Sequence, residues 1–410
     1  MSSILIQNIR WLVGTHPLSI KRLKGSDISH LPICENAFLL LDNHRIIRFG
    51  AMSEIDKPLR ADSVIDASER AVLPAFCDSH THLVFAASRE EEFEMRLKGV
   101  SYGDIAAKGG GILNSARRLT AMSETKLFDL SLPRLMEAQA LGTGAIEIKS
   151  GYGLTVESEL KMLKVIRRLK ETMPSMTIKT TFLGAHAIPI AFQANRHVYI
   201  QLILEKMIPI IAAEQLADYI DVFCEKMAFS AAETDKILDA GAKYGLKAKI
   251  HTNQFTSIGG IETAIKHKAL SVDHLEVLTD DEILLLKNND IIATLLPTAP
   301  FFLNDIHTPP ARKLIEAGAT IALATDFNPG TSPSVSMPFV VSLACIRLRM
   351  TPAESLNAAT LNGAAALELS DDYGSIAVGK KGAVILTKPI PSIAYLPYAF
   401  GTNWIEQIIN

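Results

Sequence analysis

The stretch Ala71-Val-Leu-Pro-Ala-Phe-Cys-Asp-Ser-His-Thr-His82 joins an apolar, strand-like run directly to a pair of histidines. In an extended chain alternate residues point to the same side, so His80 and His82 leave the strand end together. Two imidazoles on one face can share a metal ion. The stretch therefore predicts a buried strand that presents a metal site at its C-terminal end.

Beyond this stretch, short apolar segments alternate with amphipathic, helix-length segments from residue 71 to about 350. The predicted strands are Val72–Asp78, Gly144–Lys149, Ile178–Ala185, Ile220–Glu225, Leu246–His251, Ala269–His274, Ile291–Leu296 and Thr320–Asp326. The alternation predicts parallel strands in an α/β protein, and eight of them favour a closed, TIM-like (β/α)₈ barrel. A doubly wound open sheet is the structural alternative, although it requires no particular number of strands.

The two flanks of the chain differ from this pattern. Residues 1–70 contain short alternating runs broken by Gly, Asp, Asn and Pro, and the tail has the same character. Neither flank alone can bury much apolar surface. We therefore expect a small β-sandwich domain built from both chain ends, residues 1–70 and 365–410, beside a barrel of residues 71–364.

The composition narrows the class of protein. The net charge of −3 gives no basic field, so nucleic acid is not an expected partner. No run approaches the roughly 18 apolar residues of a membrane helix, and the N-terminus lacks a signal-peptide pattern. The four cysteines lie far apart without a CxxC pair. This usage favours a reducing compartment, and we expect a cytoplasmic protein without a membrane partner.

Active sites of such barrels lie at the C-terminal ends of the strands, and several polar residues fall there. They are His80, His82, Lys149, His186, His251, His274 and Asp326. Taken alone, a histidine after a strand is usually structural, and Asp326 could be the N-cap of a following helix. However, Ala322, Ala324 and Asp326 alternate, as expected for a strand whose small residues lead to a carboxylate at a crowded site.

Three of the histidines and the aspartate form a candidate metal-ligand set. His80, His82, His251 and Asp326 are rich in nitrogen, which favours Zn²⁺ or Fe²⁺ over Mg²⁺ or Ca²⁺. With one position open, the ion can lower the pKa of a water towards about 7. Carboxylation of Lys149 could in principle bridge a second ion, but its neighbours offer little support. The sequence therefore predicts one divalent metal ion in a hydrolase.

Several segments carry a resemblance to a known family. They are Asp78-Ser-His-Thr-His82, Lys108-Gly-Gly-Gly-Ile112, Glu147-Ile-Lys-Ser-Gly-Tyr-Gly-Leu154, Phe182-Leu-Gly-Ala-His186, Asp221-Val-Phe-Cys-Glu225, Asp273-His-Leu-Glu276 and Ala324-Thr-Asp-Phe-Asn-Pro-Gly-Thr-Ser-Pro333. In these segments the chain resembles the amidohydrolase superfamily and, within it, the cyclic-amide hydrolases of histidine degradation. The resemblance spans nearly the whole chain.

The resemblance implies hydrolysis of 4-imidazolone-5-propanoate to N-formimidoyl-L-glutamate, with His80, His82, His251 and Asp326 as metal ligands. It also implies a homodimer. The positions that it matches to substrate contacts are Arg89, Tyr102, Tyr152, His186, Gln254, Asn328, Gly330 and Thr331. A propionate tail calls for a bidentate guanidinium, which Arg89 could supply. The alternative for Arg89 is a surface ion pair with Glu90 to Glu92.

The expected catalytic residues are His274, Asp326 and Gln254. His274 is placed to stabilise the developing oxyanion, and Asp326 to move the proton. Many members of the family carry an acid where this chain has Gln254. Glutamine can orient the ring or the water but cannot accept a proton, which weakens any mechanism that uses this position as the base.

Two other functions remain open at this point. The same metal cage could serve an aminopurine or cytosine-type deaminase, which would need no guanidinium for a propionate and would release ammonia. A non-catalytic barrel scaffold is the second alternative, although such proteins tend to lose metal ligands, and all four are present here.

Overall fold

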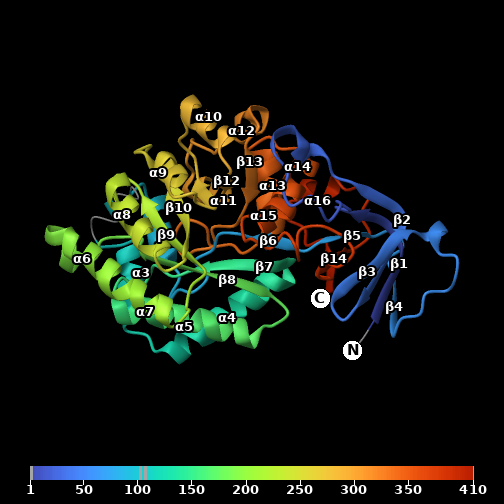
Figure 1. Ribbon diagram of the computed structural model, residues 1–410, viewed down its shortest axis with the longest axis horizontal. Helices are drawn as coiled ribbons and strands as arrows, with labels where there is room; N and C mark the ends of the chain where they lie inside the picture. The colour runs from blue at the N-terminus through green and yellow to red at the C-terminus, as the bar shows by residue number, and fades with distance from the viewer. Residues whose placement is uncertain (1–2, 101–103, 106–108, 410) are drawn as a thin grey trace.

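The computed structural model describes residues 3–100, 104–105 and 109–409 (Figure 1). Eight parallel strands form one sheet in sequence order. They are β6 (Phe76–Asp78), β7 (Thr143–Lys149), β8 (Thr177–Ala185), β9 (Tyr219–Cys224), β10 (Lys247–Thr252), β11 (Ser271–His274), β12 (Ile292–Leu295) and β13 (Thr320–Leu323). The predicted (β/α)₈ barrel is confirmed. Contacts between the first strand, β6, and the last strand, β13, exclude the open doubly wound sheet.

These contacts lie just beyond the ends of β6 and β13. The backbone N–H of Asp326 donates to the carbonyl of His80 at 3.0 Å, and the N–H of His82 donates to Phe327 at 2.8 Å. Thr81 and Phe327 also form a parallel bridge. The seam that closes the barrel therefore brings the His80/His82 pair beside Asp326.

Two predicted strands differ from those observed. The run Val72–Asp78 is divided: β5 (Ala71–Pro74) belongs to a second sheet, and only β6 enters the barrel. Pro74 has no N–H to continue the ladder, and the chain changes partners after it. The last barrel strand stops at Leu323, and Asp326 has a left-handed φ of 52°. Its position therefore comes from a turn and not from strand alternation.

The second sheet is built from both chain ends, as predicted. Its order is β15–β14–β5–β1–β2–β3, with β4 pairing to β1. The remaining bounds are β1 (Ser3–Val13), β2 (Ile33–Asp42), β3 (Arg45–Ala51), β4 (Ser63–Asp66), β14 (Val384–Thr387) and β15 (Ile405–Ile409). Figure 1 shows this sheet beside the barrel, with β14 next to the N-terminal strands. The limits of the two domains stay a prediction.

Helices follow the barrel strands and cover the outside. The main ones are α3 (Ile112–Thr120), α4 (Glu124–Ala140), α5 (Val156–Thr172), α8 (Ala231–Ala242), α9 (Gly260–Lys266), α10 (Asp280–Asn288), α12 (Ala311–Ala317), α13 (Met337–Ile346) and α14 (Pro352–Ala359). Shorter helices are α1 (Glu90–Leu97), α6 (Arg196–Leu202), α7 (Ile208–Ala213), α11 (Thr298–Leu303), α15 (Leu361–Ala365) and α16 (Tyr395–Tyr398). Three helices begin with reciprocal capping boxes, Ser230/Glu233, Thr279/Glu282 and Thr351/Glu354, which explains where they start.

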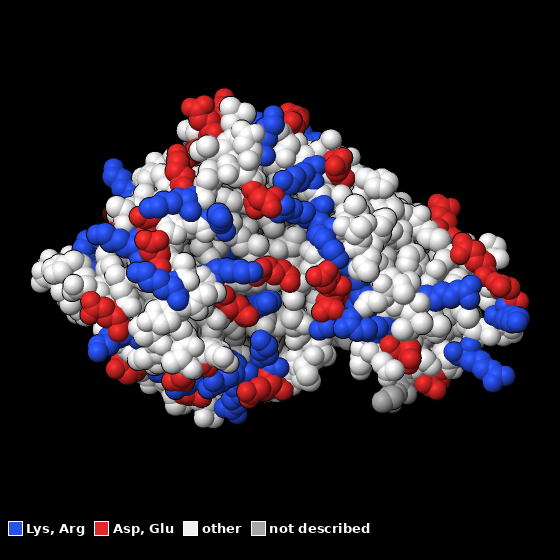
Figure 2. All heavy atoms as spheres, viewed as in Figure 1, with Lys and Arg blue, Asp and Glu red and all other residues white. Residues whose placement is uncertain are grey.

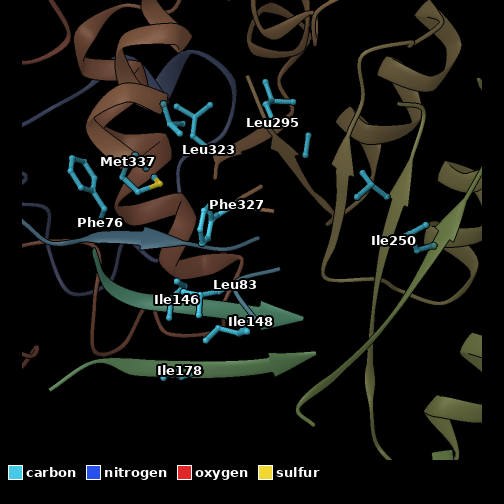
Figure 3. Close-up of a cluster of buried hydrophobic side chains, with 14 of the residues drawn as sticks. Phe76, Leu83, Ile146, Ile148, Ile178, Ile250, Leu295, Leu323, Phe327 and Met337 are labelled. Carbon is cyan, nitrogen blue, oxygen red and sulfur yellow. The ribbon is translucent and has the colours of Figure 1, made fainter. Parts of the chain in front are cut away.

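Side chains of the barrel strands alternate between two environments. Ile146 and Ile148 of β7 and Ile250 of β10 belong to the large apolar cluster between strands and helices (Figure 3). Glu147, between the two isoleucines of β7, and Lys249, next to Ile250 of β10, point the other way and form an ion pair. Since β7 and β10 are not neighbours in the sheet, this ion pair crosses the barrel interior. The strand period of two therefore separates an apolar exterior from a charged barrel interior.

The molecular surface carries both signs of charge. Figure 2 shows lysine, arginine and acidic side chains interspersed over the visible face. Among the described residues, no helix is long and apolar enough to cross a lipid bilayer.

Candidate metal centre and active-site cavity

Four predicted ligands converge at the C-terminal end of the barrel. Nitrogen atoms of His80, His82 and His251 lie within 4.8 Å of one another, and a second such group joins His80, His274 and Asp326. Nε2 of His82 and Nε2 of His251 face each other at 3.2 Å, while Asp326 Oδ1 lies 3.5 Å from His80 Nε2. All are buried. Such a nitrogen-rich group of facing ring atoms fits one divalent ion.

Two buried carboxylates lie against the histidine rings. Asp273 Oδ2 lies 2.7 Å from Nδ1 of His80, and Asp221 Oδ2 lies 2.8 Å from Nδ1 of His251. Nε2 of His80 is buried and has no hydrogen-bond partner among the described residues. A carboxylate on Nδ1 fixes the ring and leaves the Nε2 lone pair for a metal ion. The chemistry of the donor set therefore fits a metal ion.

Lys149 lies beneath this group as an ammonium. Its Nζ is 2.6 Å from Glu147 and 2.8 Å from Asp221. Burial alone would lower the pKa of Lys149, but Asp221 and Glu147 outweigh burial and hold that pKa above its usual value. A lysine must be neutral to be carboxylated, so this environment argues against a carboxylated bridge and for the single-metal prediction.

His274 follows β11 in a left-handed backbone conformation, with a φ of 89°. Its Nδ1 lies 3.4 Å from Glu276 Oε1. Burial lowers the pKa of His274, whereas the Glu276 carboxylate raises it, and the balance lies at about 9. The ring can therefore offer an N–H to an oxygen in the cavity at neutral pH. Strained backbone of this kind is often found where a side chain must be aimed at a site.

A cavity of about 390 Å³ opens above the histidines. Ten predicted site residues line it: His82, Arg89, Tyr152, His186, His251, Gln254, His274, Asp326, Asn328 and Thr331. His80 lies buried below it. Tyr102 falls outside the described residues. The barrel thus gathers residues that are more than 200 positions apart in the sequence into one small-molecule site.

His186 forms part of the cavity wall. Its ring stacks on His82 at a centroid distance of 5.1 Å, and its Nδ1 lies 3.1 Å from the carbonyl of Gly151. A carbonyl can only accept, so Nδ1 carries the hydrogen. Burial, followed by the nearby His251 ring, lowers the pKa of His186 to about 3. His186 is therefore a neutral ring whose Nε2 can accept a hydrogen bond from a ligand N–H.

Arg89 is buried at the cavity, with only 6% of its surface exposed. Its Nε and Nη1 have no hydrogen-bond partner among the described residues, and Glu92 Oε2 is 3.7 Å from Nε. A Cβ on Gly330 would lie 1.1 Å from Arg89 Nη2, so only glycine leaves room for the guanidinium. Arg89 therefore does pair with one of the neighbouring acids, Glu92, but the pair is buried at the cavity and does not lie on the surface. The guanidinium is suited to bind an anionic ligand.

The loop after β13 is held by its own side chains. Asn328 Oδ1 accepts from the N–H groups of Gly330 and Thr331, and its Nδ2 donates to the carbonyl of Asp326 at 2.6 Å. Asp78 accepts from both the N–H and hydroxyl of Thr325. The nearest following helix, α13, is capped by Ser336, so Asp326 is not an N-cap. Substrate contact by Asn328 and Thr331 stays a prediction.

Sequence reasoning missed the charged groups inside the barrel. Asp221, Asp273 and Glu276 each contact a site histidine, yet from the sequence they belong only to predicted strands or to the segments that carry the family resemblance, with no role assigned to them. The alternation of charged and apolar residues in buried strands, as in Glu147-Ile-Lys149 and Lys249-Ile-His251, was the available signal. Arg196 also lines the cavity and was not predicted, but its guanidinium already pairs with Glu233 at 2.8 Å.

The barrel and its buried histidine cluster define the class of a metal-dependent hydrolase, and comparison with known families agrees. Residues 71–403 match the amidohydrolase family. A zinc-bound adenosine deaminase from Xanthomonas campestris shares the fold, with a TM-score of 0.72, 15% identity, and coverage of 99% of this chain and 91% of that one. At this identity the likeness concerns the fold alone.

Curated relatives narrow the assignment. An imidazolonepropionase of Flavobacterium johnsoniae is 52% identical over 405 residues, which cover 99% of this chain and 98% of that protein. One from Christiangramia forsetii is 49% identical over 406 residues, with the same coverage. The chain belongs to the amidohydrolase family and, within it, to the imidazolonepropionases.

Proposed function

We propose that this protein hydrolyses the cyclic amide of 4-imidazolone-5-propanoate to N-formimidoyl-L-glutamate, the third step of L-histidine degradation. The family supports this reaction. The observation that carries it is the buried guanidinium of Arg89 in the same cavity as the histidine cluster. Its Nε and Nη1 have no hydrogen-bond partner among the described residues, although Glu92 lies 3.7 Å from Nε. A substrate with a carboxylate at one end and a cyclic amide at the other matches these two features of one cavity.

We propose His80, His82, His251 and Asp326 as the ligands of one Zn²⁺ or Fe²⁺ ion. Their nitrogen-rich character and the carboxylates behind His80 and His251 support this choice. When bound, such an ion supplies Lewis-acid chemistry and lowers the pKa of water towards about 7.

In the proposed mechanism, Arg89 and Tyr152 hold the propionate and so fix the ring in the cavity. The N–H of His274 donates to the carbonyl oxygen of the ring as water adds to the carbonyl carbon. Asp326 accepts the proton of that water and delivers it to the ring nitrogen as the C–N bond breaks. Without an ion, burial raises the pKa of Asp326 to about 6, and a bound cation would lower it again. Gln254 orients the ring or the water.

We also propose a cytoplasmic homodimer. The spread-out cysteines, all free among the described residues, support a reducing compartment. Sedimentation of the purified protein should give twice the mass of one 44.6 kDa chain.

Arg89→Met tests the proposed carboxylate contact. Loss of the guanidinium should lower kcat/KM at least about 30-fold, mostly through KM, because a buried charge-assisted pair contributes about 2 kcal/mol or more. Steady-state kinetics with imidazolonepropionate measure the change. Arg196→Met is the matched control, since that guanidinium lines the same cavity but already pairs with Glu233. Equal effects of both variants would contradict the contact.

A further inference from the structure

One buried ammonium, that of Lys149, lies between the two carboxylates that contact His80 and His251. Lys149 Nζ lies 2.8 Å from Asp221 Oδ2 and 3.7 Å from Asp273 Oδ2. The same Oδ2 atoms lie 2.8 Å from His251 Nδ1 and 2.7 Å from His80 Nδ1. Each carboxylate oxygen is therefore shared between a histidine ring on one side and Lys149 on the other. None of these side chains has more than marginal exposure.

The contacts of Lys149 with Asp221 and Asp273 cross the interior of the barrel. Lys149 ends β7, Asp221 lies on β9 and Asp273 on β11, and none of these strands is adjacent to another. Contacts between such strands can only be made by side chains that point inward. The lysine thus lies between the carboxylate that contacts His251 and the carboxylate that contacts His80.

The other contacts of the carboxylates do not replace this link. Asp221 Oδ1 accepts from the N–H of His251 at 3.1 Å, and Asp273 Oδ1 accepts from Ser271 at 2.6 Å. The first bond joins the neighbouring strands β9 and β10, and the second lies within β11. Lys249, the second buried lysine, contacts Glu147 and the carbonyl of Ser79, and neither contact involves Asp221 or Asp273.

We propose that Lys149 is a positioning residue for the metal centre, which holds Asp221 and Asp273 so that His251 and His80 are preorganised around the ion. This inference rests on the metal site of the proposed function and deepens it. Partners that orient metal ligands typically contribute 10- to 100-fold to metal affinity. The ammonium also repels a cation, so the two possible roles of Lys149 act on affinity in opposite directions.

The test is Zn²⁺ binding to the metal-free full-length protein, measured by competition with a chromophoric chelator. Lys149→Met should weaken Zn²⁺ binding about 10- to 100-fold. Lys249→Met is the matched control: it removes a buried lysine from the same network and should change Zn²⁺ affinity less than threefold. Circular dichroism of both metal-free variants records whether they fold.

Removal of one partner from a buried ion pair can prevent folding. A second variant, Lys149→Met with Glu147→Gln, removes one positive and one negative charge and keeps the net charge of the network. It should show the same loss of Zn²⁺ affinity relative to Glu147→Gln alone.

Unchanged or tighter Zn²⁺ binding by the Lys149 variants would overturn the proposal. Unchanged binding would mean that Lys149 does not position the histidines, and tighter binding would mean that its only effect is to repel the cation. An equal loss in Lys249→Met would also overturn it, since any missing buried charge would then have the same effect. Failure of the unsubstituted protein to bind Zn²⁺ would instead contradict the metal centre itself.

Discussion

Replacing His274 with alanine should lower kcat by about 10²–10³-fold while the metal content stays near that of the unsubstituted protein. His274 is aimed into the cavity by a left-handed backbone, and Glu276 favours its protonated form. Loss of one donor to a developing oxyanion typically has an effect of this size. Turnover of imidazolonepropionate and metal analysis of the same sample measure the two quantities.

His267→Ala is the control for this variant. His267 is also a histidine paired with a carboxylate, 2.7 Å from Asp235, but it lies outside the cavity. Its replacement should leave kcat within about twofold. A parallel fall of metal content and turnover in His274→Ala would instead make His274 a ligand or a structural residue.

Asp326→Asn should have the larger effect, with kcat reduced more than about 10³-fold and metal bound more weakly. Asparagine keeps the size of the side chain but cannot accept a proton, and proton transfer by a placed group is worth roughly 10²–10⁴-fold. The loop should remain intact, because Asn328 holds it through the backbone carbonyl of residue 326. Single-turnover kinetics on metal-saturated protein separate the chemical effect from metal loss.

The same variant decides which group moves the proton. If metal-saturated Asp326→Asn keeps more than about a tenth of the normal rate, another group must accept the proton. Gln254 lines the cavity but has no basic atom, and His274 is held in its protonated form, so the neutral ring of His186 would become the candidate. Such a result would contradict the mechanism but not the reaction.

The sequence was sufficient to predict that the candidate metal ligands lie close together, because barrel topology places the C-terminal ends of all strands at one face. His80, His82 and His251 could therefore be expected together without any knowledge of side-chain contacts. Asp326 was predicted for a partly wrong reason: its position follows from the turn that closes the barrel against His80, which no local pattern of the last strand encodes.

The supporting residues could not be predicted from local patterns. Asp273 and Lys149 meet across the barrel interior, and such a contact depends on strand tilt and packing as well as on sequence. Arg89 is similar, since its burial depends on Gly330, which lies 241 positions later and leaves space for the guanidinium. The sequence does not show that Gly330 packs against Arg89, and so the neighbouring acidic residues favoured a surface ion pair for Arg89.

The measurement that tests the central claim most directly is to mix the purified protein with fresh imidazolonepropionate and follow the product by mass, with and without a chelator. We expect a gain of one water, with formation of N-formimidoylglutamate, that the chelator abolishes and added Zn²⁺ or Fe²⁺ restores. Release of ammonia, or no turnover by metal-loaded protein, would contradict the account and direct attention first to Gln254.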